Sequence, residues 1–192
     1  MRMVESYLKI ISDSYGDVLP FIGVGMSIVF FLGTVLFLLF LGKRKGWRWS
    51  ARLLLIECFF LLLSLTVLFR SVGTTRSFNF TPFWSYRFIR EGHELLLTQA
   101  IANVVAFIPI GLLLGISFPD IKWWKVLLIG SAFSLLIETL QFFLRRGFAE
   151  FDDVWHNGVG VMVGYGIYVG IAYLIKRQSK KRPSAEDVLI NS

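Results

Sequence analysis

Long apolar runs with few or no charged residues, separated by polar connections, dominate the chain. Five of them have about the 20 residues that an α-helix needs to cross the roughly 30 Å hydrocarbon core of a bilayer. They are Val18–Gly42, Ala51–Phe69, Leu95–Phe118, Trp124–Leu144 and Val154–Ile175. The pattern therefore predicts an all-α fold, a polytopic membrane helix bundle with about five transmembrane helices.

The apolar runs divide the chain into four parts. Residues 1–17 form an N-terminal extracytoplasmic segment, and residues 18–69 carry the first two transmembrane helices. Residues 70–175 combine a long loop with the last three helices, and residues 176–192 form a basic tail. Because residues 1–17 lack the basic start, short apolar centre and cleavage site of a signal peptide, we expect the N-terminus to be retained.

Basic residues in the connections predict the orientation, since cytoplasmic loops of membrane proteins carry an excess of Lys and Arg. One side of the predicted bundle carries Lys43, Arg44, Lys45, Arg48, Arg52, Lys122, Lys125, Lys176, Arg177, Lys180, Lys181 and Arg182. The other side carries Arg2, Lys9, Arg70, Arg76, Arg87, Arg90, Arg145 and Arg146. We therefore expect a multi-pass protein of the plasma membrane, with its N-terminus outside and its C-terminus in the cytoplasm.

Composition agrees with a membrane protein and makes other classes less favourable. The 192 residues are 55% hydrophobic and only 17% charged. The net charge of +7 does not indicate nucleic acid, because the basic residues form short clusters between apolar runs, as membrane orientation requires. The single cysteine, Cys58, excludes an intrachain disulfide and a zinc site built on thiolates. His93 and His156 lack a two-histidine spacing, so we expect neither a metal nor another cofactor.

Polar side chains recur at helical spacing within the last three apolar runs. Intervals of three or four residues place such side chains on one helix face. They are Gln99 and Asn103, then Glu138, Gln141 and Arg145, then Asp153 and Asn157, and Gly160 and Gly164 continue the same spacing. At about 1.5 Å per residue, Glu138, Asn103 and Asn157 lie roughly 5–12 Å below the outer ends of their helices. Because polar groups are costly in hydrocarbon, we expect them to meet in a water-accessible cleft that opens outward.

Each of these residues also has a purely structural interpretation. Glu138 could pair with Arg145 or Arg146 and fix helix packing. Asn103 and Gln141 could be hydrogen-bond links between helices. For Asp152, which directly precedes Asp153, the structural alternative is a cap on the first N–H groups of the last helix.

The loop Arg70–Glu94 is long for a connection in so small a protein. Its aromatic residues are interleaved with arginines, in the order Arg76, Phe78, Phe80, Phe83, Trp84, Tyr86, Arg87, Phe88 and Arg90. One interpretation is a functional segment in the outer interface, where aromatic rings are buried and arginines bind phosphate. The other is an ordinary interfacial belt of aromatic residues.

Short motifs between about residues 75 and 175 resemble the VanZ family of bacterial membrane proteins. They are Asn79-Phe-Thr-Pro82-Phe83, Asn103 with Phe107-Ile-Pro109-Ile-Gly111, Glu138-Thr-Leu-Gln141, Arg146 with Phe151-Asp152-Asp153, and Asn157-Gly-Val-Gly160. The resemblance implies a multi-spanning protein of the bacterial cell envelope. It also implies a relationship to an accessory protein of glycopeptide resistance, chiefly resistance to teicoplanin.

The leading functional hypothesis is a protein that binds an amphiphile of the outer leaflet and, in a catalytic version, also modifies it. Candidate ligands are a lipid-linked wall precursor, another membrane lipid or a lipoglycopeptide. The candidate binding residues are Asn79, Asn103, Gln141, Arg146, Asp152 and Asn157, and the catalytic candidates, if the protein is an enzyme, are Glu138 and Asp153. The alternative is a non-catalytic helical partner or scaffold in a complex of envelope proteins.

The predicted orientation can be tested with single cysteines placed within residues 138–157 after Cys58 is replaced by serine. We expect residues near the mouth of the predicted cleft to react with a membrane-impermeant thiol reagent added to intact cells. Protection in cells, with reaction only in inverted vesicles, would reverse the predicted topology.

Overall fold

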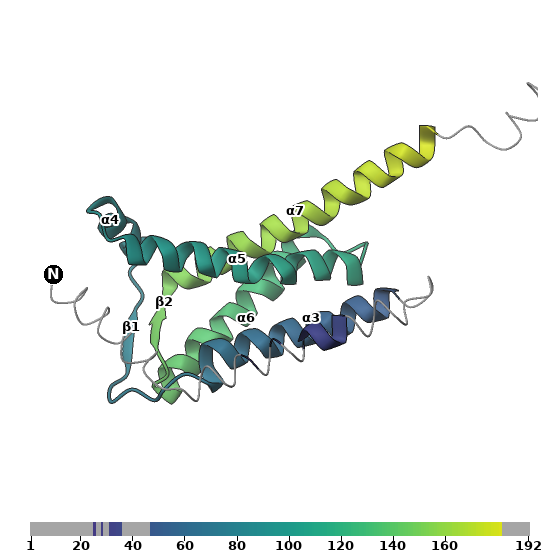
Figure 1. Cartoon of the computed structure of the whole chain (residues 1–192). Helices are drawn as coiled ribbons and strands as arrows, with labels where there is room; N and C mark the ends of the chain where they lie inside the picture. The colour runs from purple at the N-terminus through teal and green to yellow at the C-terminus, as the bar shows by residue number, and fades with distance from the viewer. Residues whose placement is uncertain (1–24, 26–27, 29–30, 36–46, 182–192) are drawn as a thin grey trace, which may run out of the picture.

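A computed structural model describes residues 25, 28, 31–35 and 47–181. The predicted helix at 18–42 lies mostly outside the described residues, as do residues 1–17 and the end of the basic tail. Within the described part, four helices are long and apolar enough to cross a membrane, namely Arg48–Leu68, Glu94–Ser117, Trp123–Leu144 and Phe151–Gln178. Each coincides with a predicted helix, so the all-α polytopic bundle is confirmed (Figure 1).

Residues 31–35 are helical, and the continuous described part of the chain starts with α3 (Trp47–Leu63), which continues into a short π-helical segment, η1 (Ser64–Leu68). The following loop is partly folded, since it contains β1 (Ser77–Asn79) and the short helix α4 (Trp84–Arg90). Next come α5 (Glu94–Ser117), α6 (Trp123–Leu144), β2 (Phe148–Glu150) and α7 (Phe151–Lys181).

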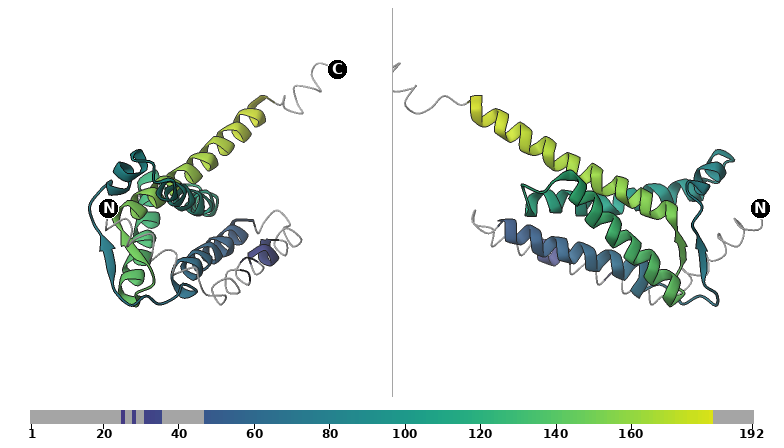
Figure 2. Two further views of the ribbon diagram at one scale, coloured as in Figure 1. Left: turned by 60° about the vertical axis from the view of Figure 1, so that its left-hand side comes forward. Right: turned by 180° about the vertical axis from the view of Figure 1, so that it is seen from behind.

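Strands β1 and β2 form a small parallel pair that the apolar pattern did not predict. Ser77 is opposite Phe148 and Asn79 is opposite Glu150. The pair ties the long loop to the segment between α6 and α7, at the end of the bundle that also carries α4 (Figures 1 and 2). We call this the strand end, and the opposite end, which holds residues 118–122 between α5 and α6, the connector end.

Helices α5 and α7 run in the same direction and approach closely because glycines lie between them. A Cβ atom on Gly160 would clash with the carbonyl oxygen of Val104, and one on Gly164 with the carbonyl oxygen of Ile108. Small residues four positions apart let two membrane helices bring their backbones together in this way. The α5–α7 contact is therefore a backbone contact as much as a side-chain contact.

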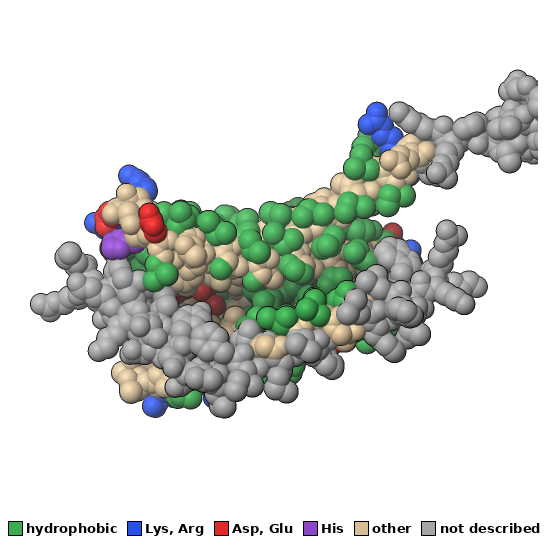
Figure 3. All heavy atoms as spheres, in the orientation of Figure 1, with side chains coloured by type: hydrophobic (Ala, Val, Ile, Leu, Met, Phe, Trp, Pro, Cys, Tyr) green, Lys and Arg blue, Asp and Glu red, His purple; other side chains and the backbone are tan. Residues whose placement is uncertain are grey.

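Helix α6 runs antiparallel to both and completes the core. Phe107 and Ile110 of α5, Ile137 of α6 and Val161 of α7 are buried together. Large apolar side chains cover much of the outer surface, as expected for helices that face lipid (Figure 3). The C-terminal half of α7 projects beyond the other described helices (Figure 2).

The close contact at Gly164 can be tested by comparing two glycine substitutions in α7. Replacing Gly164 by alanine forces the backbones of α5 and α7 apart and should lower the free energy of unfolding by about 1–3 kcal/mol. The control is Gly166→Ala, because a Cβ there meets no atom within 4 Å. That control should change stability little or raise it by up to about 1 kcal/mol. Unfolding of the full chain in detergent micelles measures both, and equal stabilities would contradict the packing.

Candidate functional site

Three carboxyl groups meet at the strand end, from Glu138 of α6, Glu150 of β2 and Asp153 of α7. The Oε2 atom of Glu138 accepts a 2.8 Å hydrogen bond from the backbone N–H of Glu150. Glu138 is also close enough to Glu150 and Asp153 for charge repulsion. Arg70 interacts with both Glu138 and Asp153 and partly balances their charge.

The Asp153 carboxyl group faces α5, where it lies against the side chains of Gln99 and Asn103. The Nδ2 atom of Asn103 is buried and has no hydrogen bond of good geometry within the part of the chain that the structure describes. The space-filling view looks into a hollow beneath α5, near β2, and acidic atoms lie at its bottom (Figure 3). The polar stripes of α5, α6 and α7 therefore converge at one end of the bundle.

Asn157 and Gln141 connect helices while keeping one polar atom unused. Asn157 Nδ2 donates to Ser134 Oγ at 2.7 Å, and Gln141 Nε2 donates to the carbonyl oxygen of Thr66 at 3.1 Å. Among the described residues, Asn157 Oδ1 and Gln141 Oε1 are buried without a partner. These residues have the geometry of the interhelical links considered as an alternative, and each retains a free acceptor atom.

Asp152 does not cap its own helix, because its carboxylate holds the start of α4. One oxygen accepts from the Phe83 backbone N–H at 2.6 Å, and the other accepts from the Ser85 N–H at 3.0 Å and the Ser85 hydroxyl at 2.5 Å. Phe83 has a left-handed φ of 58°, a conformation that is costly for an aromatic residue. The Asp152 carboxylate, which is only 1% exposed, stabilises this turn.

Further contacts pin the same loop to α7 and β2. Trp84 Nε1 donates to Glu150 Oε2 at 3.0 Å, and the Tyr86 hydroxyl lies 3.0 Å from His156 Nε2. The side-chain Oδ1 of Asn79 accepts from the Thr81 N–H at 3.0 Å, which closes a local turn. The long loop is thus a folded cap over the strand end.

Arg146 binds carbonyl oxygens where η1 ends. Its Nη1 atom donates to Val67 at 3.1 Å, to Arg70 at 2.8 Å and to Leu68. It forms no ion pair with Glu138 in the described part of the chain, nor does the exposed Arg145. The structural pairing considered for Glu138 is therefore absent there, and Arg70 is the cation beside this carboxylate.

Two members of the cluster, Arg70 and Glu150, were not predicted as site residues from the sequence. By its place in the sequence, Arg70 is one of the basic residues that predict orientation, and no motif or helical stripe includes Glu150. Neither belongs to a stripe of helical spacing, because Arg70 follows η1 and Glu150 ends β2. The short motifs include neither residue. A prediction of the β1–β2 pairing would have placed Glu150 beside Asn79.

No group of three His, Cys, Asp or Glu side chains suited to a metal ion occurs among the described residues. The arrangement offers instead several carboxylate and amide atoms for hydrogen bonding. Fold and site together define a polytopic helical membrane protein with a folded loop cap over a buried, acid-rich polar cluster.

The chain belongs to the VanZ/LLP1 family, which matches residues 53–175 and so includes the whole cluster. Protein VanZ of Enterococcus faecium is 36% identical over 93 residues, which cover 48% of this chain and 53% of that protein. The chain thus spans about half the length of the curated relative that it matches. No solved structure matches it. The family resemblance inferred from the motifs is confirmed.

The contacts of Asp152 predict that this residue holds the loop cap. Asp152→Ala should lower the free energy of unfolding by about 2 kcal/mol, because buried N–H groups lose a charged acceptor. It should also speed amide hydrogen exchange in residues 83–90, measured by mass spectrometry. Asp120→Ala, which removes an exposed carboxylate at the connector end, should leave this exchange unchanged. Unaltered exchange in the Asp152 variant would contradict the assignment.

Proposed function

We propose that this protein binds the polar head of an amphiphile in the leaflet at the strand end, with the cluster of Glu138, Asp153 and Asn103 as the site. One observation carries the proposal. Carboxylate and amide groups from three helices gather at one end of an otherwise apolar bundle, beside a hollow that reveals acidic atoms (Figure 3). Ionisable groups are costly at such depths, so a cluster of this kind is a functional site by default.

The charges favour a head group that donates hydrogen bonds. Glu138 and Asp153 share one nearby arginine, Arg70, so negative charge exceeds positive charge at these two groups. Sugar hydroxyls, peptide amides and ammonium groups are suitable donors. Lipid-linked wall precursors and lipoglycopeptides carry such groups, and so do amine-bearing phospholipids.

The loop cap supplies a second region for the same ligand. Arg76, Arg87 and Arg90 are exposed in this loop, and so are the aromatic rings of Phe80 and Phe83. Arginines bind phosphate through paired hydrogen bonds, and aromatic rings settle at the membrane interface. A ligand with a donor-rich head and an anionic linker to a lipid tail fits both regions, and a lipid-linked wall precursor has this composition.

The cluster residues have different roles in this proposal. Glu138, Asp153 and Asn103 contact the head group, and Gln141 and Asn157 offer their free oxygens. Asp152, Arg146 and Asn79 act as positioning residues, because their polar atoms hold backbone groups of the cap and of η1. In the catalytic version, Glu138 and Asp153 exchange protons with the bound head.

The family relationship suggests a physiological setting for this binding. We propose an accessory role in the bacterial envelope, in tolerance of agents that act on it, including glycopeptide antibiotics such as teicoplanin. The second candidate is a non-catalytic helical partner in an envelope complex. It is favoured by the projecting half of α7, where Ile171, Tyr173 and Leu174 are exposed.

Conservative substitutions at the cluster separate the two candidates. Glu138→Gln keeps an oxygen that accepts from the Glu150 N–H, and Asp153→Asn keeps the side-chain size, so both should preserve the fold. If the cluster is the site, each should weaken binding of a fluorescent lipid-linked wall precursor by about tenfold or more, which is about 1.4 kcal/mol. Binding is measured by titration of the purified full chain, and thermal unfolding is followed in parallel.

The control is Glu57→Gln, which changes a partly buried carboxyl group on α3 outside the cluster. It should leave precursor binding intact. Loss of stability without loss of binding by the folded fraction would favour the scaffold. Mass spectrometry of the precursor after incubation tests the catalytic version, in which both cluster variants abolish product formation.

A further inference from the structure

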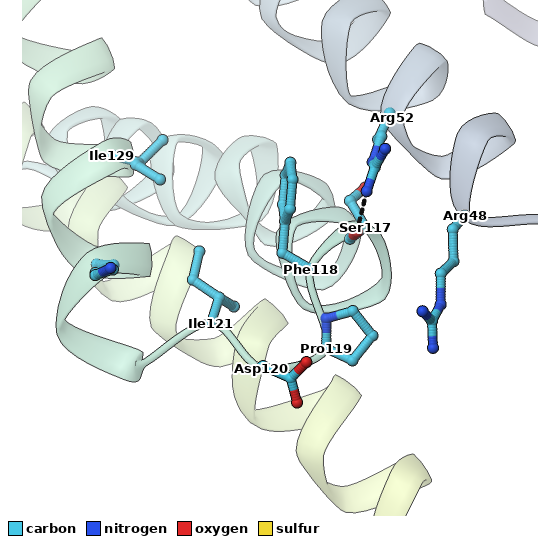
Figure 4. Close-up of a pocket in the computed structure, with 9 residues that line it drawn as sticks. Arg48, Arg52, Ser117, Phe118, Pro119, Asp120, Ile121 and Ile129 are labelled. Atoms are coloured by element: carbon cyan, nitrogen blue, oxygen red, sulfur yellow. Dashed lines mark hydrogen bonds between the residues drawn. The ribbon is translucent and has the colours of Figure 1, made fainter.

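A second polar site lies at the connector end, far along the bundle from the acidic cluster. It is an open pocket of about 500 Å³ between the start of α3, the end of α5 and the start of α6. Arg48 and Arg52 line it from α3, Ser117 from α5, and Lys125 from α6, with Asp120 in the connection (Figure 4). None of these residues belongs to the candidate site described above.

The pocket is basic and its charges are not neutralised. Arg48, Arg52 and Lys125 line it together with a single carboxylate, that of Asp120. Within the described residues, none of the three cations forms an ion pair. A group of unpaired cations around a cavity attracts an anion.

Arg52 is held in position to receive this anion. Its guanidinium carbon lies 4.6 Å from the ring centre of Trp49 and 5.0 Å from that of Phe118. Its Nη2 atom reaches the carbonyl oxygen of Ser117 at a long 3.5 Å. Its Nε atom is buried without a partner among the described residues. The side chain is thus oriented by stacking, with a donor still unused.

Ser117 provides an independent observation that points to a ligand site. Its side chain is fully buried, and its Oγ atom has no partner in the part of the chain that the structure describes. Hydroxyls elsewhere in the helices, such as those of Ser64, Thr66 and Thr139, donate to the carbonyl four residues earlier. An unsatisfied buried hydroxyl in the wall of a basic pocket indicates a ligand with an acceptor oxygen.

We propose that this pocket binds a phosphate group, presented by an anionic phospholipid of the adjacent leaflet. A phosphate has several acceptor oxygens for Arg52 Nε, Ser117 Oγ and the two exposed cations. The lipid source is favoured over phosphate from solution because Phe118 and Ile129 give the pocket an apolar wall. Basic pockets between transmembrane helices are typical binding places for anionic head groups.

The test uses the purified full chain in detergent, with native mass spectrometry to count bound lipid. We expect the chain to retain phosphatidylglycerol at least about fivefold more tightly than phosphatidylcholine of the same chain length. The double variant Arg48→Gln/Lys125→Gln should lower phosphatidylglycerol affinity by about tenfold or more. Both side chains are exposed, so the fold should be kept.

The matched control is Lys176→Gln/Arg177→Gln, which removes the same charge from exposed residues in the projecting half of α7, outside both sites. It should leave phosphatidylglycerol affinity unchanged. Ser117→Ala should lower affinity by about threefold, yet leave the thermal stability of the lipid-free chain equal or higher, because an unpaired buried hydroxyl is removed. If Ser117 had only a structural role, its substitution would not lower lipid affinity while leaving the thermal stability of the lipid-free chain equal or higher.

Competition with inorganic phosphate and glycerol 3-phosphate distinguishes the sources of the anion. Displacement of phosphatidylglycerol by millimolar phosphate would assign the pocket to a soluble phosphate, whereas retention of the lipid would assign it to the membrane. Equal affinity for the two lipids, or equal losses in the two double variants, would overturn the proposal.

Discussion

The close approach of α5 and α7 determines where the polar groups of the strand end lie. Gly160 and Gly164 allow the backbone of α7 to rest on the carbonyls of Val104 and Ile108. Asp153 is seven residues, or about two turns, before Gly160, so it emerges on the same face and meets Asn103. A wider helix spacing would separate these side chains and leave each to find its own partner in hydrocarbon.

The polar groups near this contact are of two kinds. Some satisfy backbone groups of the fold, and others remain available to bind a ligand. Asp152 and Arg146 satisfy backbone N–H and carbonyl groups of the loop cap and η1, which regular helices would have satisfied internally. Glu138 and Asp153 instead repel each other beside a shared arginine. Repulsion between buried carboxylates does not stabilise a bundle, and this is why we assign binding to them. The pocket at the connector end is basic, whereas this cluster is acidic, so the two sites favour different ligands.

Particular residues show how far the site could be predicted. The stripes containing Asn103, Gln141 and Asp153 were visible because helix periodicity is a local property of the sequence. The role of Asp152 was not visible, because its partners at Phe83 and Ser85 lie almost seventy positions away. The assignment of each polar residue to binding or to scaffolding depends on such distant partners.

By itself, the sequence determined the class of protein, the described transmembrane helices to within a few residues and the family. These follow from apolar runs and motif order, both of which are read along the chain. Only the tertiary structure decided that β1 pairs with β2, that Arg70 and Glu150 join the acidic cluster, and that Arg52 and Ser117 line one pocket. The physical reason is that hydrogen bonds and charge contacts between helices depend on their spacing and rotation, which no single helix specifies.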